Sequence, residues 1–190
     1  MGTLITGLIL FLGIHLLRET GMRESMVREL GTGPYRLIFS VVAVTGLVLV
    51  FWGRTLIPFI QVYTPLYQFR YLGNILMLPA VILVVAGSLP QSWIRRSVVH
   101  PMLTGIILWG GAHLWTNGDL ASLLLFGAFT LWALAKMTSL GFADRKTAKR
   151  PWFFWDLAAL VVGCLLYFFL VTYHGDLFGV GVVVCLTMAC

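Results

Sequence analysis

The stretch "HPMLTGIILWGGAHLWTNGD" (residues 100–119) combines a long apolar run with one ionisable side chain near its end. Between Pro101 and Trp115 it contains no Asp, Glu, Lys or Arg. Such a run, closed by an Asn-Gly-Asp turn, is typical of a helix that crosses lipid and satisfies its own backbone hydrogen bonds. An imidazole inside it is costly unless it is hydrogen-bonded or binds something, so His113 is a candidate functional residue.

The whole chain shares this apolar composition. Of its 190 residues, 59% are hydrophobic and only 11% are charged, whereas a soluble domain has roughly a quarter of its residues charged. The sequence therefore predicts an all-α protein: a single transmembrane domain, residues 1–190, folded as a polytopic bundle of about six helices in contact with the lipid bilayer. The net charge of +6 fits loops that orient the chain in a membrane, and no nucleic-acid partner is expected.

Six apolar segments have about the length that a helix needs to cross the hydrocarbon core. The tail after the sixth is also apolar but rich in glycine, and we expect a half-helix or an interfacial segment there. The six predicted segments are residues 2–17, 35–52, 71–89, 98–116, 120–140 and 156–173, and the tail is residues 175–190.

Basic residues predict the orientation of the chain. All thirteen Lys and Arg residues except Arg54 and Arg70 lie in or beside the first, third and fifth loops. Because cytoplasmic loops carry the excess of Lys and Arg, these odd-numbered loops are predicted to be cytoplasmic and the N-terminus periplasmic. The first loop, from Arg18, alternates Arg and Glu around Met22, Met26 and Leu30, which predicts a short amphipathic helix at the membrane surface.

The four histidines differ in their predicted depth. His100 and His174 lie at segment ends near water, whereas His15 and His113 lie deeper. Each deep histidine is compatible with a structural hydrogen bond or with a ligand role. Neutral imidazole is the usual axial ligand of haem, and two histidines on different helices can hold its iron from both sides. Trp109 is one turn before His113 and could form a wall of such a pocket, or simply pack in the core.

The fourth segment and its turn resemble the signature of the NnrU family of bacterial membrane proteins. The matching elements are a His-Pro pair, a Gly, a Trp, Ala112-His113-Leu114 and Asn-Gly-Asp. The stretches "LGIHLLRE" and "LGTGPYRLIFSVVAV" are similar to the family's N-terminal half. This resemblance implies a multi-pass protein of the bacterial inner membrane with a genetic link to nitric oxide and denitrification.

The plant and cyanobacterial zeta-carotene isomerase is similar to the same family. It is a haem b enzyme, and its haem histidines correspond by motif to His15 and His113. The resemblance thus implies haem b here, with nitric oxide or an apolar small molecule as partner, and a haem-dependent isomerase or redox sensor as the activity. A cysteine that the isomerase carries one turn before its second histidine corresponds to Gly110, which cannot ligate a metal.

The predicted depth of each histidine in the membrane tests whether His15 and His113 could bind the same haem. At 1.5 Å per residue, His15 and His113 differ in predicted depth by roughly 10 Å. His15 with His100, or His113 with His174, would be better matched in depth, so these pairs stay as alternatives.

Other functions also stay open. A non-catalytic membrane assembly protein needs no cofactor, and a homo-oligomer is compatible with the same apolar surface. A membrane methyltransferase that uses S-adenosylmethionine also has a His-Pro helix start. The region "FADRKTAKRPWFFWD" has too few matching carboxylates for that class.

Overall fold

The computed structural model describes residues 1–17, 20–66, 70–141 and 150–180, and the regular elements in these ranges are all helices. The chain divides into two compact units, residues 1–60 and 61–190, which are described separately. The helices are α1 (Gly2–Leu16), α2 (Met22–Leu30), α3 (Thr32–Thr55), α4 (Arg70–Ser88), α5 (Trp93–Ser97), α6 (Pro101–Thr116), α7 (Leu120–Leu140) and α8 (Phe153–Phe178).

The predicted helical membrane bundle is confirmed. Each of the six predicted apolar segments forms a helix, and α2 is the short helix predicted in the first loop. The sixth segment continues past Tyr173 to Phe178 as part of α8. The rest of the predicted tail, residues 181–190, and the basic residues Arg145, Lys146 and Lys149 lie outside the described residues.

Four helices in the described ranges are long and apolar enough to cross a membrane, namely α3, α4, α7 and α8. Their outward side chains include Val44 at 61%, Leu131 at 69% and Phe168 at 65% exposure. Such exposed apolar surface needs lipid as its solvent. The chain is thus a multi-pass membrane protein. Helices α1 and α6 are shorter, with 15 and 16 residues.

The N-terminal unit is built on the contact between α1 and α3. Three glycines let the two backbones approach: a Cβ atom added at Gly7 would lie 2.6 Å from the Val50 nitrogen, and Gly46 and Gly53 are equally crowded. Leu4 is fully buried in this contact. Membrane helices associate through such small residues because lipid offers no hydrophobic driving force between them.

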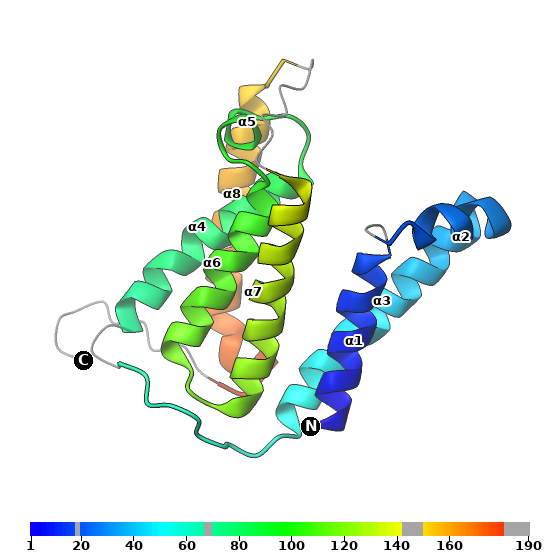
Figure 1. Ribbon diagram of the computed structural model, residues 1–190. Coiled ribbons are helices and arrows are strands. Elements are labelled where there is room, and N and C mark those ends of the chain that lie inside the picture. The colour runs from blue at the N-terminus through cyan, green and yellow to red at the C-terminus, as the bar shows by residue number, and fades with distance from the viewer. Residues whose placement is uncertain (18–19, 67–69, 142–149, 181–190) are drawn as a thin grey trace. The chain divides into compact units, whose positions relative to one another are not determined.

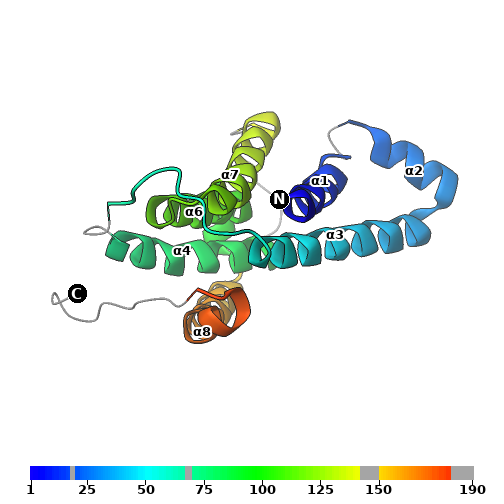
Figure 2. The same ribbon diagram turned by 90° about the horizontal axis from the view of Figure 1, so that it is seen from below.

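In the C-terminal unit the long helices pack in the order α7, α6, α4, α8. Figure 1 shows α4, α6 and α7 side by side. Figure 2 shows α8 on the side of α4 opposite to α6 and α7. Glycines again mark the contacts: Gly105 of α6 packs on the Ala80 carbonyl of α4, and Gly163 of α8 packs on Ile82 of α4. This arrangement places the C-terminal end of α6 close to the C-terminal end of α8.

Candidate cofactor site

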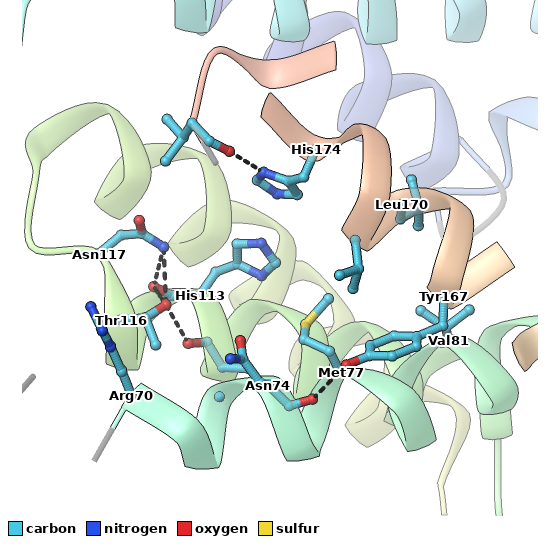
Figure 3. A pocket seen from close by; sticks show the side chains of 14 residues that line it. Arg70, Asn74, Met77, Val81, His113, Thr116, Asn117, Tyr167, Leu170 and His174 are labelled. Atoms are coloured by element: carbon cyan, nitrogen blue, oxygen red, sulfur yellow. Dashed lines mark hydrogen bonds between the residues drawn. The ribbon is translucent and has the colours of Figure 1, made fainter. Parts of the chain in front are cut away.

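A cavity of about 250 Å³ lies between α4, α6 and α8 (Figure 3). Its walls mix apolar side chains with a few polar groups, as ligand pockets do. The lining residues are Arg70, Gly73, Asn74, Met77 and Val81 from α4; Ala112, His113 and Thr116 from α6, followed by Asn117; Tyr167, Leu170, Val171 and His174 from α8; and Val180.

His113 enters the cavity from the last turn of α6. Its Nδ1 donates to the Trp109 carbonyl, one turn earlier, at 2.9 Å. The ring stacks on Phe126 of α7, with ring centres 4.1 Å apart and an angle of 26° between the planes. Trp109 lies against the same ring at 5.3 Å and packs edge-on to Phe126. The imidazole is therefore fixed in orientation, with Nε2 as the ring nitrogen available for a ligand.

His174 reaches the same cavity from α8. Its Nδ1 lies 2.5 Å from the Val180 carbonyl. Its ring centre lies 6.4 Å from that of His113, and the two ring planes are 23° apart. Figure 3 shows the two rings one above the other. One of the two alternative pairs, His113 with His174, is therefore brought together.

The Asn-Gly-Asp turn holds the end of α6 beside the cavity. Asn117 Nδ2 donates to the His113 carbonyl at 2.9 Å. The Gly118 carbonyl accepts the N–H groups of Val62 and Tyr63 at 2.8 and 3.1 Å. Asp119 caps α7 by accepting the Ser122 N–H and hydroxyl at 3.0 and 2.6 Å. The motif thus ends one helix, starts the next and binds the preceding loop.

Tyr63 fastens that loop to α6. Its hydroxyl is within hydrogen-bonding reach of the carbonyls of Leu114 and Asn117, the latter at 2.6 Å, and its single proton is shared between them. Burial raises the pKa of Tyr63, and the negative charge of Asp119 raises it further. The phenol therefore remains a donor throughout the physiological pH range, and the carbonyls at the end of α6 keep a partner.

A family model matches residues 3–182, which is most of both units. The chain belongs to the NnrU family. The matching model is described as NnrU protein. No curated protein and no solved structure matches the chain significantly.

The other histidines of this NnrU protein lie elsewhere. His100 precedes α6 with a left-handed backbone, φ 53° and ψ 61°, and its Nε2 lies 3.1 Å from the Gly141 carbonyl at the end of α7. His15 belongs to the N-terminal unit, where its Nδ1 lies 2.6 Å from the Phe11 carbonyl and its ring packs edge-on to Phe39. The pairing of His15 with His113 stays a prediction.

Sequence reasoning overlooked the polar part of the cavity wall. Arg70 and Asn74 of α4 line it, and Tyr167 of α8 donates to the Asn74 carbonyl at 3.5 Å. The clearest sequence signal for this wall was Arg70, one of the two basic residues that do not lie in or beside the first, third and fifth loops. A cation there would suit an acidic group of a bound molecule.

Among the described residues, no three His, Cys, Asp or Glu side chains come together as a metal site. A haem differs because four nitrogens of the macrocycle hold the iron and the protein supplies one or two axial ligands. The imidazole of His113, with its Nδ1 on a backbone carbonyl and a cation at the cavity wall, has the donor chemistry of an axial ligand. The cavity volume lies below the 300–1,000 Å³ of pockets that enclose a drug-sized ligand, so these walls would enclose a haem only in part.

Proposed function

We propose that this NnrU protein is a haem b-binding protein of the bacterial inner membrane, with His113 as an axial ligand. The observation that carries the proposal is the fixed imidazole of His113 in the cavity between α4, α6 and α8. A hydrogen bond from Nδ1 to a carbonyl is the usual support of a metal-ligating histidine, because it fixes the tautomer and the ring orientation. The motif around Ala112-His113-Leu114 resembles that of the haem-containing zeta-carotene isomerase, and this resemblance would imply the same assignment.

The haem would supply an iron that binds a small molecule such as nitric oxide or exchanges an electron. The chain's own residues would orient and shield it: Phe126 holds the His113 ring, and Met77, Val81 and Leu170 keep the cavity apolar. Arg70 is the candidate partner for a propionate. The genetic link that the family resemblance implies favours a nitric-oxide-linked sensor or redox protein.

The residue at position 110 argues against a carotenoid-type isomerisation. In this chain Gly110 stands where the isomerase has its cysteine, and its α-carbon faces Thr130 of α7. A thiolate that exchanges with His113 is therefore missing. An isomerase reaction here would need haem chemistry without that exchange.

An absorption spectrum of detergent-purified protein, made with ample haem, tests the proposal. We expect a Soret band, and we expect His113→Ala to lose the haem or to change its coordination. His100→Ala is the matched control, because His100 binds the Gly141 carbonyl away from the cavity, and it should leave the spectrum unchanged. A wild-type protein without Soret absorbance would overturn the haem assignment and favour an assembly role.

A further inference from the structure

Helix α5 lies at the end of the C-terminal unit that is remote from the cavity. It connects the end of α4 at Ser88 to the start of α6 at Pro101, and Figure 1 shows it beside the first turns of α8. The ends of membrane-spanning helices lie at the level of the lipid headgroups. The side chains of α5 and of the start of α8 are therefore expected at that level.

Two sets of hydrogen bonds fix α5 against the start of α8. The Trp152 N–H donates to the Gln91 carbonyl at 3.2 Å. One residue pair further along, the Asp156 carboxylate accepts the N–H groups of Trp93 and Ile94 at 2.9 and 2.8 Å. The side chains of α5 and those around Trp152 therefore belong to one continuous surface.

This surface exposes three large aromatic side chains. Trp93 is 53% exposed, Trp152 is 65% exposed and Phe153 is 66% exposed. Tryptophan is enriched at membrane interfaces because its ring is apolar while its N–H can bond to a headgroup or to water. Such a surface suits the glycerol region and the upper acyl chains of a lipid.

The same surface carries arginines whose charge is not neutralised by their own contacts. The Arg96 guanidinium lies over the Trp93 ring, 5.7 Å from its centre. This contact orients the guanidinium without cancelling its charge. Arg95 donates one N–H to the Leu89 carbonyl, which leaves its charge and its other N–H groups for a further partner.

The sequence places no exposed acid on these two segments to balance the arginines. Residues 89–100 and 150–155 contain no Asp or Glu, and Arg150 adds a third exposed or half-exposed cation. The carboxylate that follows, Asp156, is only 5% exposed and bonds to the backbone of α5. The surface is therefore positive as well as aromatic, which makes it complementary to an anion that carries apolar chains.

We propose that this surface binds an anionic phospholipid, with Arg96 on the phosphate and the glycerol region against Trp93 and Trp152. Arg95 adds positive charge beside the phosphate. A guanidinium forms paired hydrogen bonds with phosphate oxygens, and basic sites at the ends of membrane helices bind anionic headgroups. The surface lies at the start of α8, whereas the cavity lies near its end, so this inference is independent of the haem assignment.

Lipid titration of the full-length protein in neutral detergent micelles tests the proposal. Phosphatidylglycerol and phosphatidylcholine with the same brominated acyl chains quench nearby tryptophans, so quenching measures how strongly each lipid binds. We expect phosphatidylglycerol to quench the wild type at a lower lipid fraction than phosphatidylcholine. Arg96→Gln should weaken the binding of phosphatidylglycerol about fivefold, the effect of one basic residue near an anionic surface. The double variant Arg95→Gln/Arg96→Gln should weaken it by about 25-fold.

Arg36→Gln is the matched control, because it removes the same charge from an exposed position in the N-terminal unit. It should bind phosphatidylglycerol as the wild type does. Excess inorganic phosphate should not displace the lipid, since it has no apolar part to contact the aromatic rings. Single-variant Arg96→Gln keeps the test valid if loss of the Arg95 bond to Leu89 disturbs α5.

Three results would overturn the proposal. Equal quenching of the wild type by the two lipids would show an ordinary lipid-facing surface without headgroup selectivity. An unchanged affinity in Arg96→Gln, or an equal loss in Arg36→Gln, would show that this arginine does not bind the headgroup. Displacement by inorganic phosphate would identify a site for a soluble anion instead.

Discussion

Gly110 shows how the lack of one side chain sets the distance between two helices. Its α-carbon faces the Thr130 hydroxyl of α7, and a Cβ atom there would also lie 3.1 Å from the Phe126 carbonyl. Phe126 is in turn the ring on which His113 stacks. The close approach at Gly110 therefore keeps α7 near enough to support the histidine one turn later.

We expect Gly110→Cys to lower the stability of the protein and to add no thiolate ligand. The new side chain would be forced against α7, and overpacking of this kind costs about 1–3 kcal/mol. Thermal denaturation in detergent measures the effect. Gly111→Cys is the matched control, since nothing lies within 4 Å of a Cβ atom there.

Adding Thr130→Ala to Gly110→Cys should recover part of the loss, because it removes the nearest atom. A Gly110→Cys protein as stable as wild type would mean that α6 and α7 are not packed as described.

At the scale of elements, α5 depends on a carboxylate from another helix. Asp156 of α8 accepts the N–H groups of Trp93 and Ile94 at 2.9 and 2.8 Å and is 5% exposed. Ser92 accepts the Arg95 N–H at 3.2 Å, so the first turn of α5 is capped twice. The negative charge also suits the positive end of the helix dipole.

Asp156→Ala should therefore release α5 from α8. Two partly buried N–H groups would lose their acceptor, and each loss costs at most about 1–3 kcal/mol, the range for a fully buried group. Trypsin cleavage after Arg95 or Arg96 reports the release, and it should become faster in Asp156→Ala. The control is Asp176→Ala, an exposed carboxylate near the end of α8. Equal cleavage rates in wild type and Asp156→Ala would contradict the capping role.

The long helices could be predicted from sequence, but α5 could not. A long apolar run predicts a membrane helix from its own residues, so all six segments could be predicted from the local composition alone. Helix α5 is only five residues long. A helix that short does not form by itself. The carboxylate that stabilises it belongs to Asp156, which accepts the Trp93 N–H and lies 63 residues later in the sequence.

The candidate site was predictable only in part for a similar reason. The burial of an ionisable group along an apolar run identified His113. The proximity of His174 depends on how α8 packs beside α4 and on the turn at Gly179, and neither is visible in a local pattern. Arg70 is one of only two basic residues on its predicted side of the membrane, but its place at the cavity required the fold.

For the molecule as a whole, the charge pattern still determines the expected orientation. Arg95, Arg96 and Arg150 flank helices on the side predicted to be cytoplasmic, whereas the Asn117–Asp119 turn lies on the opposite side. A cysteine introduced at Arg150 should be blocked by a membrane-impermeant thiol reagent only after the cells are opened. One introduced at Asn117 or Thr64 should react in intact cells.

The native Cys164, Cys185 and Cys190 must first be replaced by serine or alanine. Labelling on the reverse sides would contradict the predicted periplasmic N-terminus.

Because the chain is divided into two units, we expect the N-terminal unit to pack before the C-terminal unit during synthesis. Helices α1 and α3 contact each other within residues 1–60, so their packing can be complete soon after that segment leaves the ribosome. The cavity needs α8, which begins at Phe153. A molecule that occupies this cavity can therefore be enclosed only after α8 has entered the membrane, at a late stage of the protein's synthesis.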